Sequence, residues 1–192
     1  PFHAAAPGRA ASRPAEVQTA QISIPEPVAK EPEQAVRMQR EIVQRFAALP
    51  GVTAAAIVRS LPNDGGNQNP LYIEDRDYGD GKLPPLRQFN HISPGYVAAM
   101  GTRLAAGREM TWEETFQQAP VALISENMAR ELWREPAAAL GKRIRATMKD
   151  EWREVIGVIA DLRSDGLNRP APPIVYWSLY QKNTEGVPVR IV

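Results

Sequence analysis

The sequence contains no cysteine and only two histidines among its 192 residues. The absence of cysteine excludes disulfide bonds, thiol catalysis and zinc sites built on thiolates. The histidines, His3 and His91, are far apart, and a lone histidine is more often a packed or hydrogen-bonded side chain than a base or a ligand. We therefore expect no metal and no cofactor.

Long hydrophobic runs are also missing. The longest mainly apolar runs, residues 52–58 and 155–160, have the length of strands, whereas a helix needs ~20 apolar residues to span a bilayer. The first residues, PFHAAAPGRAASRP, lack the apolar core of a signal peptide. Because there is no initiator methionine and the sequence stops within the apolar segment VPVRIV, we expect a piece of a longer protein.

Neither sign of charge dominates the composition. Lysine and arginine total 23 against 22 aspartate and glutamate, giving a net charge of +1. Without a basic face interleaved with aromatic residues, the sequence predicts no nucleic-acid partner. Hydrophobic residues make up 43% of the chain, which is enough to fill a core.

No arrangement of nucleophile, base and orienting group is recognisable either. The serines that precede loops or helices, such as Ser125, lack the G-x-S-x-G setting of a nucleophile. Asp161 and Asp165 lie four residues apart and, with His91, could form the acid/base pair of a small hydrolase. Carboxylates beside a turn more often bond to the backbone, so we expect no enzyme.

The most informative stretch runs from Phe89 to Met110. Residues 87–92 predict a half-buried strand, and Ser93 and Pro94 stand where an N-cap and a first helical residue belong. Tyr96, Val97 and Met100 share one face of a short helix, Gly101 ends it, and Gly107 marks a turn. Thr111 and Glu114 have capping-box spacing, which predicts a second short helix over residues 112–116.

The remaining pattern predicts mixed α and β structure. Apolar residues at three- and four-residue spacing predict helices over residues 33–49 and 126–134, the second capped by Ser125. The stretch SLPNDGGNQNP, residues 60–70, reads as a loop. Strands are predicted over residues 21–24, 52–59, 71–76, 121–125, 142–145, 152–162, 174–179 and 187–192.

Five ordered segments are similar to one known domain. They are LPGVTAAAIVRSLP, ISPGYVAAMGTRLAAGREM, VALISENMARELW, LGKRI and EVIGVIADLRSDGLNRPAPPIVYWSLYQ. Over about residues 21–192 the sequence resembles the periplasmic core domain of MacB-type ABC transporter permeases, and most of all the orphan permeases of the FtsX-like superfamily.

The resemblance implies an α+β fold with two lobes. A porter-like βαβ lobe would comprise residues 21–90 and 172–192, and an inserted, mixed α/β lobe, the sabre of this family, would comprise residues 91–171. Residues 1–20 would be a poorly ordered arm or linker. Family members continue after the last strand with a helix, a strand and a membrane span, so the porter-like lobe would be incomplete here.

The resemblance also implies a function without chemistry of its own. The domain would face the periplasm at the bacterial inner membrane, between membrane helices of its parent chain. An ABC ATPase subunit or domain would drive its movement, so that it acts on an efflux substrate, an adaptor or a carrier protein, with a homodimer as a candidate assembly. The alternative is a free-standing periplasmic ligand- or protein-binding module. We expect partner contacts at the exposed tips, loop 60–70 and helix 111–118, at Asn63, Asp64, Asn67, Trp112, Glu113 and Glu114.

Overall fold

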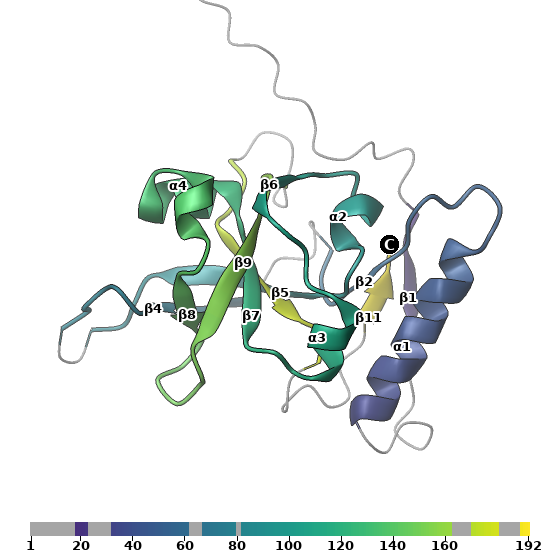
Figure 1. Ribbon diagram of the computed structural model, residues 1–192, viewed down its shortest axis with the longest axis horizontal. Coiled ribbons are helices and arrows are strands. Elements are labelled where there is room, and N and C mark those ends of the chain that lie inside the picture. The colour runs from purple at the N-terminus through teal and green to yellow at the C-terminus, as the bar shows by residue number, and fades with distance from the viewer. Residues whose placement is uncertain (1–17, 23–31, 62–66, 80–81, 163–169, 181–188) are drawn as a thin grey trace, which may run out of the picture.

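The computed structural model describes residues 18–22, 32–61, 67–79, 82–162, 170–180 and 189–192 (Figure 1). The α-helices are α1 (Pro32–Ala47), α2 (Tyr96–Ala99), α3 (Trp112–Phe116) and α4 (Glu126–Trp133), and Pro136–Ala139 forms the 3-10 helix η1. The strands are β1 (Ala20–Ile22), β2 (Ile57–Val58), β3 (Asn67–Pro70), β4 (Tyr72–Ile73), β5 (Leu86–Ile92), β6 (Leu104–Gly107), β7 (Val121–Ser125), β8 (Arg143–Arg145), β9 (Arg153–Ile159), β10 (Ile174–Ser178) and β11 (Val189–Ile191).

The strands form one mixed sheet. Its order is β1-β11-β2-β5-β10-β7-β9-β8-β4, with β3 paired to β5 and β6 paired to β9. The pairs β5–β10 and β7–β9 are parallel, and the other pairs are antiparallel. In Figure 1, α1 lies beside β1 and β11 at one end of the molecule, and α4 lies near β8 at the other. The mixed sheet with few helices confirms the predicted α+β class.

Both faces of the central strands are buried, as the near-continuous apolar sequences of β7, β9 and β10 require. On β10, Ile174 and Tyr176 pack in the core that contains α2, whereas Val175 and Trp177 pack on the opposite face under α4. A third cluster joins Val43 of α1 to the sheet. Because successive side chains of β10 point to opposite faces of the sheet, this one strand contributes to both main clusters.

A bulge on β9 brings two glycines close to neighbouring backbone. Ala122 pairs with Val155 but Leu123 pairs with Gly157, so Ile156 is the extra residue. A Cβ atom on Gly107 would lie 2.2 Å from the Ile156 carbonyl oxygen. The prediction that Gly107 marks a turn is therefore wrong: this residue ends strand β6, where close packing against β9 leaves no room for a side chain.

The predicted elements around residues 33–49, 87–92, 112–116, 121–125 and 174–179 are confirmed with small shifts at their ends. The expected loop 60–70 is partly wrong, because Asn67–Pro70 is strand β3 along β5. The predicted strand 52–59 shrinks to Ile57–Val58.

One predicted cap is wrong, and a second is confirmed in its position but not in its hydrogen bond. The N-cap of α2 is Gly95, with φ 87°, and not Ser93. The Ser93 hydroxyl instead accepts the Ile57 N–H at 2.9 Å. Ser125 occupies the N-cap position of α4, but its hydroxyl makes no capping bond.

The sheet crosses the predicted boundary between the two lobes. β5 and β10 belong to the predicted porter-like lobe and β7 to the predicted sabre-like lobe, yet β10 pairs with both β5 and β7. The division at residues 91 and 171 stays a prediction. The expected arm, residues 1–20, lies mostly outside the described residues.

Candidate functional site

The short helix α3, one of the two predicted contact regions, is fixed by a complete capping box. The Thr111 hydroxyl accepts the Glu114 N–H at 3.1 Å, and the Glu114 carboxylate accepts the Thr111 N–H at 2.9 Å. Arg108 donates to both oxygens of Glu114, at 2.9 and 2.6 Å. These hydrogen bonds, led by Arg108, lower the pKa of Glu114 from 4.5 to about 2. Glu114 thus has a structural role on this helix.

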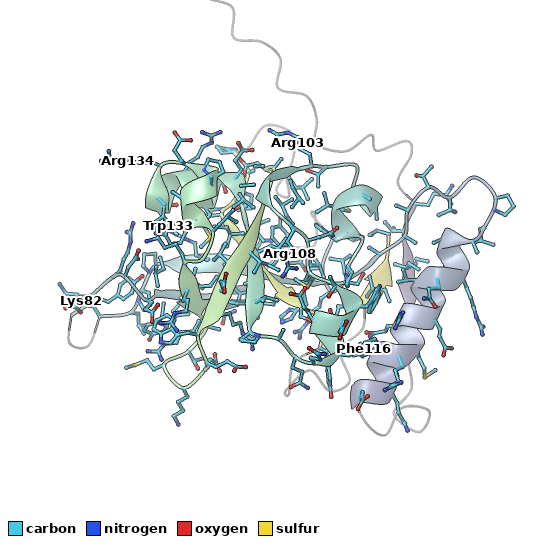
Figure 2. All side chains as sticks on the ribbon, in the orientation of Figure 1. Lys82, Arg103, Arg108, Phe116, Trp133 and Arg134 are labelled. Carbon is cyan, nitrogen blue, oxygen red and sulfur yellow. The ribbon has the colours of Figure 1, made fainter. Side chains whose placement is uncertain are left out.

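The aromatic residues of α3 fasten it to α1. Trp112 is half-buried and packs against the cluster around Val43. The guanidinium groups of Arg37 and Arg40 lie 5.6 and 5.7 Å from the centre of the Phe116 ring. Figure 2 shows Phe116 at the end of α3 that faces α1. Among the three predicted contact residues of α3, Glu113 is exposed, whereas Trp112 and Glu114 are half-buried.

Of the other three predicted contact residues, the structure describes Asn67 alone. Asn63 and Asp64 lie outside the described residues, and Asn67 begins β3, opposite Phe89. That the six residues share one surface stays a prediction, as does their role in partner binding.

A groove that sequence reasoning missed opens between the end of α3, the β8–β9 hairpin and the strands β5 and β10. We call it the β5–β10 groove, and its volume is about 540 Å³. Its lining residues come from β3, β5, β9, β10 and their connections: Arg59, Asn69, Phe89, His91, Gln118, Ala146, Thr147, Lys149, Asp150, Glu151, Arg153, Trp177 and Tyr180.

The floor of the groove is an aromatic pair held by strand register. Trp177 of β10 stands opposite His91 of β5 in the parallel pairing. The rings of Phe89 and Trp177 meet edge to face, with centroids 5.3 Å apart and an interplanar angle of 86°. The Arg153 guanidinium lies 5.6 Å from the centre of the Trp177 ring. The floor is thus a buried aromatic pair with a guanidinium group beside Trp177.

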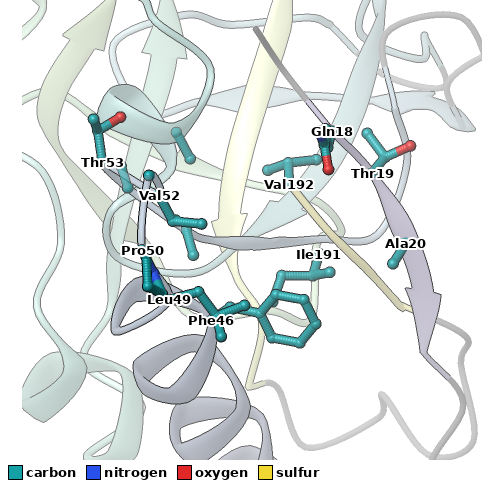
Figure 3. A pocket seen from close by; sticks show the side chains of 14 residues that line it. Gln18, Thr19, Ala20, Phe46, Leu49, Pro50, Val52, Thr53, Ile191 and Val192 are labelled. Carbon is teal, nitrogen blue, oxygen red and sulfur yellow. The ribbon is translucent and has the colours of Figure 1, made fainter.

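A second, more apolar hollow lies where α1 ends beside β11 (Figure 3). Phe46, Leu49, Val52, Ile191 and Val192 are among its lining residues. Three of these, Phe46, Leu49 and Val52, expose 37, 50 and 37% of their surface. The hollow is therefore an apolar surface next to the β1–β11 edge of the sheet.

Asp161, considered above as an acid or base, has a backbone partner. Its carboxylate accepts the N–H of Asn127 at 2.8 Å at the start of α4, which is the role expected for a carboxylate near a helix N-terminus. Burial raises the pKa of Asp161 despite this bond. Asp165, its partner in the hydrolase hypothesis, lies outside the described residues.

Within the described residues, no group of three or more histidine, aspartate and glutamate side chains is arranged to hold a metal ion. The helices of the described part are all too short or too polar to cross a bilayer.

Comparison with protein families gives one match over most of the chain. The family described as MacB-like periplasmic core domain matches residues 8–186. No curated protein matches the sequence.

Solved structures with a similar fold are domains of transporters. The periplasmic region of MacB from Actinobacillus actinomycetemcomitans is 16% identical, with a TM-score of 0.54 over 80% of this chain and 63% of that one. A domain of a putative permease from Porphyromonas gingivalis is 20% identical, with a TM-score of 0.50 over 79% of this chain and 64% of that one. The extracellular domain of the noncanonic ABC-type transporter YknZ from Gram-positive bacteria is 17% identical, with a TM-score of 0.52 over 91% of this chain and 83% of that one.

The likeness to these structures establishes the fold, and the chain spans less than two thirds of the first two. The family match, which extends over far more than half of the sequence, agrees with the five similar segments and with the mixed sheet. The chain belongs to the family of MacB-like periplasmic core domains.

Proposed function

We propose that this domain transmits movement, without chemistry of its own, from membrane helices of its parent permease to a periplasmic substrate, adaptor or carrier protein. The observation that carries the proposal is the family match over residues 8–186. The parent protein would lie in the bacterial inner membrane with this domain facing the periplasm, and an ABC ATPase subunit or domain would supply the energy.

The sheet topology supports such transmission. Within the described residues, β1 and β11 come from opposite ends of the sequence and pair with each other at one edge of the sheet. From that edge, hydrogen-bonded ladders continue through β5, β10 and β7 to β8 and β4. A packed, hydrogen-bonded sheet resists deformation, so a displacement applied at β1 and β11 would move the far edge with it.

The contact surface of this proposal is the exposed side of α3. Glu113 is the best test residue because it is exposed and, among the described residues, its carboxylate accepts a bond from the Gln117 amide alone, at 3.0 Å, on the same helix. Charge reversal at Glu114 would break the capping box. We therefore expect Glu113→Lys to weaken partner binding without unfolding α3, and Gln44→Lys on exposed α1 is the control.

Movement can be measured in the intact permease, reconstituted in vesicles with its ATPase. The chain lacks cysteine, so Met148→Cys, at a residue that is 69% exposed, gives one labelling site in this domain. Energy transfer from a dye at this site to acceptor-labelled lipid headgroups should change when ATP is added. A dye at Gln44→Cys on α1 should report a change at the same time.

The control is the same assembly with an ATPase that binds but does not hydrolyse ATP. In this assembly, repeated changes in energy transfer should stop. Steady ATP hydrolysis with no change at either dye would contradict the proposal.

The β5–β10 groove favours a second candidate, a free-standing periplasmic binding module, since ligand sites are concave and carry a few polar groups. The complete reading frame distinguishes the two functions. Apolar runs of ~20 residues on both sides of this domain would support the permease, and a frame without any would support the free module.

A further inference from the structure

We propose that the β5–β10 groove binds a small polar organic anion, carrying carboxylate or phosphate groups, with Arg59 and Arg153 as the principal cations. This site is independent of the proposed coupling function, because it requires only the folded domain. Two features of the groove support the inference. Its two arginines are half-buried and pair with no carboxylate of the described residues, and its acidic residues lie on one wall.

The described part of the chain contains four half-buried arginines, Arg59, Arg87, Arg145 and Arg153. Arg87 is paired with Glu131 at 2.5 Å. Arg145 stacks on the Trp152 ring, 4.2 Å from its centre, and does not line the groove. Neither Arg59 nor Arg153 pairs with a carboxylate of the described residues, and both line the groove. A partly desolvated guanidinium gains more from an anionic partner than an exposed one does.

The strands hold these two arginines on opposite sides of the aromatic floor. The Arg59 N–H donates to the His91 carbonyl oxygen at 2.9 Å, which fixes Arg59 beside β5. Arg153 begins β9 and stacks on Trp177. Because β2, which ends just before Arg59, and β9 lie on opposite sides of the β5–β10 pair in the sheet, the groove runs across the sheet from Arg59 to Arg153. A ligand between them would meet a cation at each end.

The acidic residues of the groove are confined to one wall. Asp150 and Glu151 belong to the β8–β9 hairpin, where the Asp150 carboxylate accepts the Thr147 N–H at 2.8 Å. Lys149 lies on the same hairpin. The wall around Arg59 contains no carboxylate among the described lining residues. An anion would therefore bind most strongly at the Arg59 end.

Size and polarity limit the class of ligand. A volume of about 540 Å³ falls within the range of small-molecule sites. Asn69, Gln118 and Tyr180 add neutral hydrogen-bonding groups around the arginines, and Phe89 and Trp177 are only 8 and 2% exposed. The groove therefore suits a polar, multivalent anion better than an apolar one.

Calorimetric titration of the 192-residue chain with citrate, and separately with inorganic phosphate, tests this site. We expect saturable binding of at least one of the two anions, weakened by added salt. Arg59→Gln should lower the affinity about tenfold, because the lost hydrogen bonds to a charged group contribute roughly that factor to binding. Arg153→Gln should lower the affinity as well. The anion that binds more tightly shows whether the groove prefers carboxylate or phosphate groups.

The matched control is Arg45→Gln, which removes the same charge from an exposed position on α1 outside the groove, and it should leave the affinity unchanged. The urea midpoint of each variant shows that it is folded. Absence of saturable binding of both anions at millimolar concentration would overturn the proposal. Equal weakening by Arg45→Gln would overturn it too, because diffuse charge would then explain the binding.

Discussion

At the scale of single residues, a buried hydroxyl joins three elements, β7, β10 and α4. Ser125 is 1% exposed, accepts the Ile174 N–H of β10 at 2.9 Å and donates to the Asn127 side chain. We expect Ser125→Ala to lower the free energy of unfolding by about 1–3 kcal/mol, because a buried N–H loses its acceptor. Urea unfolding followed by tryptophan fluorescence measures this. Thr147→Ala, which removes an exposed hydroxyl, should cost less than about 0.5 kcal/mol, and an equal cost would contradict the account.

Glycines in the same fold differ in what a methyl group would meet. A Cβ on Gly157 would lie 2.2 Å from the Arg108 carbonyl oxygen, whereas one on Gly101, at φ 61°, would meet nothing within 4 Å. We expect Gly157→Ala to cost about 3 kcal/mol or more because backbone must move, and Gly101→Ala only about 1–2 kcal/mol of left-handed strain. Thermal unfolding of both variants compares them, and a reversed order would show that β6 adapts freely.

At the scale of elements, carboxylates at three helix starts differ in their environment. Burial raises the pKa of Glu109, which accepts the Val97 N–H at 3.0 Å, and the pKa of Asp161. Glu114 at α3 is instead held by Arg108, and its pKa falls to about 2. The pKa of a helix-capping carboxylate is therefore raised in Glu109 and Asp161 but lowered in Glu114. Burial decides whether desolvation or the charge of the partner has the larger effect on the pKa.

The lowered pKa of Glu114 determines how the stability that this residue provides depends on pH. The pKa of Glu114 in the folded protein, about 2, lies below its ordinary value of 4.5. The ionised carboxylate therefore stabilises the fold fully above pH 4.5, and this stabilisation is lost as the pH falls toward 2. We expect Glu114→Gln to lower stability by about 1 kcal/mol at pH 7, because Arg108 is exposed and solvent screens the pair, and to match the wild type near pH 2. Urea midpoints at several pH values test this against exposed Glu113→Gln, and a difference that persists at low pH would contradict it.

Elements with local signals were predictable from the sequence, and those set by distant partners were not. Spacing alone revealed α1 and the capping box of α3. The segment NQNP becomes β3 because β5 offers it a ladder, although its residues are typical of loops. Likewise Ser93 bonds to Ile57, which is 36 positions away, and no local pattern reveals this. The β5–β10 groove was missed for the same reason, since the register between His91 and Trp177 brings its parts together.

At the scale of the whole molecule, the central strands should unfold as one unit. β10 bonds to β5 on one side and β7 on the other, and its side chains enter both main clusters. Native-state hydrogen exchange should therefore give the amides of β5, β7 and β10 the same opening free energy, equal to that of global unfolding. The edge strands β1 and β4 should open more easily.

Ser125→Ala makes this test decisive, because Ser125 lies in β7, within the predicted sabre-like lobe. If the sheet is cooperative, the variant should lower protection in β5, in the predicted porter-like lobe, by the same free energy as in β7, whereas Thr147→Ala should lower neither. Protection lost in β7 and β9 but kept in β5 and β10 would show that the lobes open separately. A separately opening lobe could not carry movement from β1 and β11 to the far edge, so that result would also weaken the proposed coupling function.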